Sequence, residues 1–125
     1  MNVPNELRYS KSHEWVKMEG DTALVGITDF AQNELGDLVF INLPNVGDVV
    51  ARDEAFADVE SVKAVSDIIS PISGTVAEVN EELGDAPERI NEDAYAAWIV
   101  RLSDLSDLDD LLSAQEYEAF IKEEG

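Results

Sequence analysis

The sequence predicts a mainly β protein: a sandwich of two antiparallel sheets with quasi-twofold symmetry, one short internal helix and a helical C-terminal segment. Short β-prone runs recur along most of the chain, and glycine, proline or acidic residues stop them. Leucines recur at helical spacing only toward the C-terminus, over about 104–123. Two strand–turn–strand segments, which close with Gly47-Asp48 and Gly84-Asp85, flank a central hairpin and suggest the twofold relation.

The composition is that of one small globular domain over 1–125, because 45% of the residues are apolar and the length suits a single modest core. No apolar run approaches the roughly 20 residues that cross a bilayer. The first residues lack the features of a signal or transit peptide. Cysteine is absent, which excludes disulfides, thiolate metal sites and cysteine nucleophiles.

The chain is strongly acidic, with 28 Asp and Glu against eight Lys and Arg and a net charge of −20. Such a surface repels phosphate backbones and anionic membranes, so we expect neither nucleic acid nor membrane as a partner. It favours basic patches on partner proteins instead. The charge also suits the cytoplasm of a halophilic prokaryote, where salt screens the self-repulsion.

The first half of the chain predicts two strands, a helix and a third strand. An extended entry at 7–9 precedes a hairpin of strands 12–18 and 22–27 that turns at Gly20. Thr28 fits the N-cap of a short helix over 29–34, and Gly36 lies just past its end. An apolar strand over 37–43 stops at Pro44.

The second half predicts a hairpin of strands 55–59 and 66–70, a strand at 75–80, a polar loop at 85–93 and a last strand at 98–102. Two helices are expected after it. The first is indicated by leucines at helical spacing, namely Leu105, Leu108, Leu111 and Leu112. Ser113 and Glu116 fit a capping box that opens the second. The acidic residues between the leucines are interpreted as a solvated face.

Lys63 is the candidate functional residue, because the central hairpin places its amine at a turn where it is exposed to water. A Schiff-base lysine needs an apolar pocket or a neighbouring cation. The nearby carboxylates of Asp58, Glu60 and Asp67 instead favour the charged ammonium form. Lys63 is therefore a poor nucleophile and a better handle for modification by another enzyme. The alternative is a solvated lysine loosely paired with Glu60.

Other catalytic signatures are missing from the sequence. His13 is the one histidine, so it either packs in the first strand or serves as a catalytic or ligand residue. The seven glycines form neither a P-loop nor a dinucleotide-binding motif. The sequence thus predicts a modifiable handle without catalytic apparatus.

Residues 60–67 resemble the lipoylation site of the glycine cleavage H-protein family. Lys63 is flanked by Glu60, Ser61, Val62 and Ala64, and a Ser-Asp pair follows. Two other carrier families fit less well. Biotin carriers usually have Met on both sides of their lysine, and lipoyl domains of 2-oxo-acid dehydrogenases usually have Asp-Lys-Ala, whereas this chain has Val62-Lys63-Ala64. The resemblance covers nearly the whole chain, including 9–15, 25–29, 35–37, 43–44, 70–74, Asn91 and Trp98. One departure is Ala94 in place of proline, with a loop from Tyr95 to Trp98 that is one residue shorter.

This resemblance implies a barrel-sandwich hybrid of the lipoyl-domain type, with the lysine on a hairpin tip. It further implies that lipoate is attached to Lys63 in amide linkage, and that the loaded arm folds into a surface cleft. The contacts implied for the arm are Ser12, Glu14 and Asp67. Trp15 and Phe56 either border this site or pack in the core.

The function implied by the resemblance is that of a non-catalytic, monomeric carrier. It takes the aminomethyl group of glycine from glycine decarboxylase, the P protein, to aminomethyltransferase, the T protein. Dihydrolipoamide dehydrogenase, the L protein, reoxidises the dithiol, and a lipoate-attaching enzyme modifies Lys63. Two alternatives stay open: a lipoyl donor or interaction scaffold that uses the same lysine, and an enzyme that uses Lys63 as a Schiff base.

The acidic composition generates a first prediction, that the stability of the fold depends on salt. Added KCl screens repulsion between carboxylates, so the melting temperature should rise between low and molar KCl. Thermal unfolding followed by circular dichroism measures this directly. A melting temperature that does not respond to KCl would reject adaptation to high salt.

Overall fold

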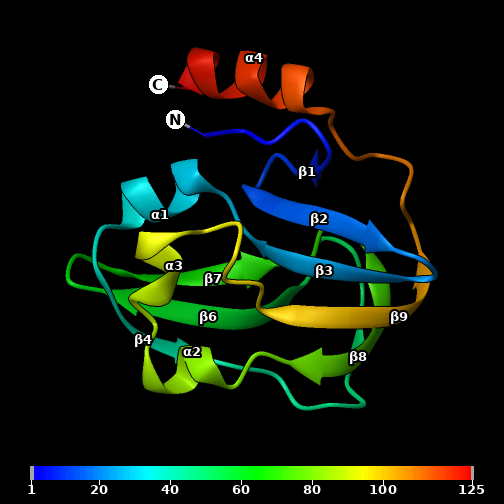
Figure 1. The fold of residues 1–125 in the computed structure, drawn as a ribbon, viewed down its shortest axis with the longest axis horizontal. Helices are drawn as coiled ribbons and strands as arrows, with labels where there is room; N and C mark the ends of the chain where they lie inside the picture. The colour runs from blue at the N-terminus through cyan, green and yellow to red at the C-terminus, as the bar shows by residue number, and fades with distance from the viewer. Residues whose placement is uncertain (1, 125) are drawn as a thin grey trace.

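The computed structural model describes residues 2–124 and contains two antiparallel sheets that enclose the core (Figure 1). The larger sheet has the strand order β1-β2-β3-β9-β8-β5, and the smaller sheet has the order β4-β6-β7. The elements in chain order are β1 (Arg8–Tyr9), β2 (Glu14–Glu19), β3 (Thr22–Ile27), α1 (Asp29–Leu35), β4 (Leu38–Asn42), β5 (Val49–Val50), β6 (Ala55–Ser61), β7 (Val65–Ile69), β8 (Ser73–Val79), α2 (Glu82–Asp85), α3 (Arg89–Glu92), β9 (Val100–Ser106) and α4 (Ala114–Glu124). The prediction of a mainly β fold with two antiparallel sheets is confirmed.

Local signals in the sequence set the first part of the fold. The turn between β2 and β3 uses Gly20 at a φ of 65°, a left-handed conformation that glycine adopts without steric cost. The Oγ1 atom of Thr28 accepts a hydrogen bond from the Ala31 N–H at 3.2 Å, as the predicted N-cap requires. Gly36, with a φ of 82°, ends α1.

Two apolar clusters hold the elements together. The larger cluster lies between the sheets and includes Val25, Val59 and Leu102. The smaller lies beneath α4, where the Tyr9 and Tyr117 rings stack with centroids 4.7 Å apart. Figure 1 shows α4 and the N-terminal segment on the same side of the molecule, beyond β1. Trp15 and Phe56 both pack against these clusters, with Trp15 fully buried in the smaller one.

The C-terminal segment contains one helix and not the two that were predicted. Leu105 belongs to β9, and Asp104 and Asp107 have φ values of 51° and 59°, which a right-handed helix cannot contain. Leu112 exchanges two backbone hydrogen bonds with Tyr9, at 2.9 and 2.7 Å. Extended backbone pairing therefore overrides the helical leucine spacing. The capping box of the second helix is confirmed, since Ser113 and Glu116 bond each other's backbone N–H groups.

The segment predicted as a polar loop at 85–93 is also different in the structure. It begins at the last residue of the single-turn helix α2 and contains all of the single-turn helix α3. Each of these helices is anchored by one buried apolar residue, Leu83 and Ile90 respectively. One apolar residue per helix is too little to produce a periodic signal. Within residues 2–124, no helix is long and apolar enough to cross a membrane.

Candidate functional site

Lys63 is exposed at the tip of the β6–β7 hairpin, as predicted, and the turn that carries it is fixed by hydrogen bonds. The Ser61 N–H donates to the Ala64 carbonyl at 2.8 Å. The Ser61 hydroxyl oxygen accepts from the backbone N–H groups of Lys63 and Ala64, both at 3.1 Å. Ser61 therefore acts as the turn residue that presents the lysine.

The tip is also attached to the end of α1. The Val62 N–H donates to the Asp37 carbonyl at 3.0 Å. A Cβ atom placed on Gly36 would lie 3.2 Å from the Lys63 Cε, so the lysine stem runs directly over this glycine. Asn91 holds the loop between α1 and β4, because its Nδ2 donates to the Gly36 carbonyl and its Oδ1 accepts from the Leu38 N–H. The stem thus starts beside the helix that forms one wall of a cleft.

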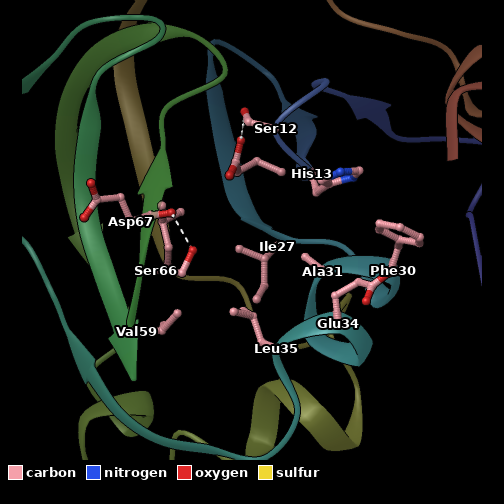
Figure 2. Close-up of a pocket in the computed structure, with 12 residues that line it drawn as sticks. Ser12, His13, Ile27, Phe30, Ala31, Glu34, Leu35, Val59, Ser66 and Asp67 are labelled. Carbon is pink, nitrogen blue, oxygen red and sulfur yellow. Dashed lines mark hydrogen bonds between the residues drawn. The ribbon is translucent and has the colours of Figure 1, made fainter. Parts of the chain in front are cut away.

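A cleft of about 330 Å³ opens between α1, β3, β7 and the segment before β2 (Figure 2). Half of its twelve lining residues are apolar, namely Ile27, Phe30, Ala31, Leu35, Val59 and Ile68. Polar groups come from Ser12, Glu14, Glu34 and Ser66. This lining can hold an apolar chain that ends in a polar or charged group.

Glu14 is the buried acid of this cleft, with 2% of its surface exposed. Its Oε1 atom accepts hydrogen bonds from the hydroxyls of Ser10 and Ser12, at 2.8 and 2.5 Å. The Ile69 N–H approaches its Oε2 atom at 3.4 Å. Burial raises the pKa of Glu14 to about 7, and these hydrogen bonds oppose the shift only in part. Ser12 and Glu14 are therefore brought together at one wall.

Asp67 does not point its carboxylate toward these two residues. Figure 2 shows its side chain on the far side of β7, while the neighbouring Ser66 points into the cleft. Because successive strand residues face opposite sides, one of the two had to face outward. Ser66 is thus a lining residue that sequence reasoning missed, and its hydroxyl donates to the Asp67 carbonyl at 3.4 Å.

The backbone of Asp67 still borders the cleft. Ser61 and Ala64 form the hydrogen-bonded pair that closes the hairpin. Along antiparallel strands, hydrogen-bonded pairs alternate with non-hydrogen-bonded pairs. By this alternation Asp58 and Asp67 are a non-hydrogen-bonded pair, so the N–H and C=O of Asp67 point off the free edge of β7. The neighbouring Ile69 N–H, which points to Glu14, has the same orientation.

Behind the cleft, Tyr117 of α4 joins two of its walls. The Tyr117 hydroxyl lies 2.7 Å from the Thr28 Oγ1 and 2.8 Å from the His13 Nδ1. His13 has a φ of 74° in the turn before β2, and its ring packs on Phe30 with centroids 4.7 Å apart. His13 is therefore a packing residue of a turn and not of a strand. Sequence reasoning missed Tyr117 because its partners lie 89 and 104 residues away.

The loop before β9 packs against other parts of the protein. The indole N–H of Trp15 donates to the Ala94 carbonyl at 3.0 Å. The Tyr95 hydroxyl donates to the Asn2 carbonyl at 2.6 Å and accepts from the Asp29 N–H at 3.2 Å. This loop thus packs the N-terminal segment and the start of α1 together.

Two antiparallel sheets with a lysine exposed at a hairpin tip are the arrangement expected of biotinyl and lipoyl carrier domains. Comparison with known proteins narrows the class. The family model described as glycine cleavage H-protein matches residues 7–124. The glycine cleavage system H proteins of Halalkalibacterium halodurans and Geobacillus kaustophilus are 59% and 57% identical to the chain, cover 98% of it, and are themselves covered over 98% and 99% of their lengths.

A solved structure agrees with the sequence comparisons. The crystal structure of a glycine cleavage system H protein from Mycobacterium marinum superposes with a TM-score of 0.90 at 39% identity, over 96% of this chain and 99% of that one. The chain belongs to the glycine cleavage H-protein family. The resemblance found in the sequence is therefore confirmed.

The buried Glu14 predicts a pH dependence of stability. The pKa of Glu14 is about 7 in the folded protein and near 4.5 in the unfolded chain, because the fold favours the neutral carboxyl. The stabilisation of the fold by this neutral carboxyl is fully present below pH 4.5 and is lost as the pH rises through 7. Glu14→Gln removes this loss. The free energy of unfolding of the variant, relative to wild type, should increase by about 2–3 kcal/mol between pH 4.5 and 8.

Urea unfolding at several pH values measures this difference. Glu34→Gln removes an exposed carboxylate of the same cleft and controls for the loss of a charge. Parallel stability curves for Glu14→Gln and wild type across this range would contradict the assignment.

Proposed function

We propose that this chain is the lipoyl carrier of the glycine cleavage system and that lipoate is attached to Lys63. The observation that carries the proposal is the position of Lys63, which stands on a fixed turn with its stem over Gly36, at the end of the helix that lines a cleft of matching chemistry. Family membership supports the carrier role and a non-catalytic part in the system. The chain presents a group and other proteins perform the chemistry.

The residues around the cleft fit a lipoyl arm. The apolar lining suits its hydrocarbon chain, and Ser12 with Glu14 offers oxygen atoms to a cationic end. When attached, lipoate supplies a dithiol on which the aminomethyl group of glycine passes from glycine decarboxylase to aminomethyltransferase, and dihydrolipoamide dehydrogenase reoxidises it. Tethering raises the effective concentration of the cargo at each partner.

In this proposal the chain's own residues hold the cargo and keep water away from it. An ionised Glu14 attracts an ammonium group, and this attraction in turn favours ionisation of a carboxyl whose pKa is near 7. Ser12 orients the Glu14 carboxylate through its hydroxyl. Asp67 takes part through its backbone at the free edge of β7, because its side chain points to the other face.

The attachment site is tested by mass mapping. Wild-type protein incubated with a lipoate-attaching enzyme should carry lipoate on Lys63 alone, and Lys63→Arg, which keeps the charge, should carry none. The remaining lysines Lys11, Lys17 and Lys122 serve as internal controls. Lipoate on any of these three in wild type, or its absence from Lys63, would refute the proposal.

The role of Glu14 is tested on the aminomethyl-loaded protein in the absence of the transferase. Glu14→Gln should accept lipoate normally, because Lys63 is presented by its own turn, but should release ammonia about tenfold faster or more. The ratio of the two release rates should grow as the pH rises through 7, where the Glu14 carboxylate ionises. Glu34→Gln is the matched control. Equal rates in Glu14→Gln and wild type at pH 8 would show that Glu14 does not hold the cargo.

A further inference from the structure

Four exposed apolar side chains gather around the turn that carries Lys63. Among the side chains that the structure describes, eight large apolar ones are exposed, and half of them form this cluster. They are Val39, Phe40, Val62 and Val65, with exposed fractions of 57, 49, 67 and 67%. We name them the outer patch. On a chain with a net charge of −20, a local gathering of apolar surface marks a site of protein contact.

Strand register places Phe40 and Val65 of the outer patch on the face of the small sheet opposite the cleft. Phe40, Glu60 and Val65 lie in register across β4, β6 and β7, and residues directly opposite share a face. An irregularity of β4 lies between Leu38 and Phe40, so that Val39 is exposed beside Phe40. The cleft-lining residues of these strands, Val59 and Ser66, belong to the other face.

The outer patch has an acidic border. The next row on the same face consists of Asn42, Asp58 and Asp67, which are in register with one another. The Asn42 amide donates to the Asp58 carboxylate at 3.3 Å, as expected for neighbours on one face. Glu60 lies within the patch itself. A protein that covers this surface must combine an apolar centre with basic residues at the rim.

We infer that the outer patch is the docking surface for the enzyme that attaches lipoate to Lys63, an inference that rests on the proposed function. The reaction forms an amide bond between the Lys63 Nζ and the carboxyl carbon of an activated lipoate; the activating group leaves and the amine loses a proton. A lysine side chain is short, so the enzyme that reaches Nζ must contact the residues beside the turn. Enzymes that act on the dithiol meet the arm at its far end and need no such contact.

The lysine turn therefore has two functional sides. The attaching enzyme contacts the outer patch before modification, and the arm turns to the cleft on the opposite face afterwards. Occupation of the cleft leaves Val39, Phe40 and Val65 exposed, because these side chains do not line it.

The test compares two double variants of the unmodified protein. Phe40→Thr with Val65→Thr replaces apolar surface in the outer patch by a residue of high β propensity. Val46→Thr with Val49→Thr makes the same change at two exposed positions, 65 and 84% exposed, of which Val49 belongs to β5 of the other sheet. The measurements are kcat and KM for attachment of lipoate by a lipoate-attaching enzyme, and the affinity of each unmodified variant for that enzyme in competition with wild type.

The patch variant should raise KM and weaken binding by about tenfold or more with kcat nearly unchanged, and the control should change either value less than twofold. Equal KM and binding for the two variants would overturn the inference while leaving lipoylation of Lys63 intact. Normal attachment combined with slower loading by glycine decarboxylase would also overturn it and assign the patch to that enzyme. Failure of wild type to accept lipoate at Lys63 would instead refute the proposed function. Thermal unfolding of both variants verifies that these exposed substitutions leave the fold unchanged.

Discussion

The position of Lys63 at the hairpin tip depends on the hydroxyl of Ser61. By accepting two backbone N–H groups it fixes the turn, and the hydrogen bond from Val62 to Asp37 fixes the turn against the end of α1. The Lys63 side chain therefore extends from a turn whose backbone is held by hydrogen bonds. An arm mounted on an ordered base loses less conformational entropy when it enters a cleft or an active site than one mounted on a mobile loop.

The period of a β-strand divides the functional residues between two faces. On β7, Ser66 faces the cleft and Asp67 faces away, and on β6 the same alternation separates Val59 from Glu60. In the function and docking surface proposed above, one sheet of three strands thus serves a bound arm on one side and a partner protein on the other. The cleft side is completed by α1, whose position is held by Asn91 and by its N-cap.

The sequence predicted those features that depend on neighbouring residues. The hairpin tip, the Thr28 cap and the Ser113–Glu116 capping box each involve side chains within four positions of the backbone that they contact. Ser12 and Glu14 were indicated by the family resemblance and not by local geometry, but their hydrogen bond is also short in sequence separation. These parts of the fold and of the site follow from short-range geometry.

The features that the sequence did not predict depend on distant contacts. The leucines after residue 104 have helical spacing, but Leu112 pairs with Tyr9 more than 100 positions away. The outward direction of Asp67 depends on which face of the hairpin meets the core, and no pattern within 60–67 specifies it. The burial that raises the pKa of Glu14 likewise comes from the assembled fold.

The bridge formed by Tyr117 has a consequence for the order in which the molecule can be assembled. The turn that presents Lys63 is closed by Ser61 and Ala64 and tied to Asp37, all in the first 64 residues. Two walls of the cleft are joined by the Tyr117 hydroxyl, which lies near the C-terminus. A chain leaving the ribosome therefore contains every residue of the Lys63 turn long before it contains Tyr117, so the cleft is the last part of the candidate site to be completed.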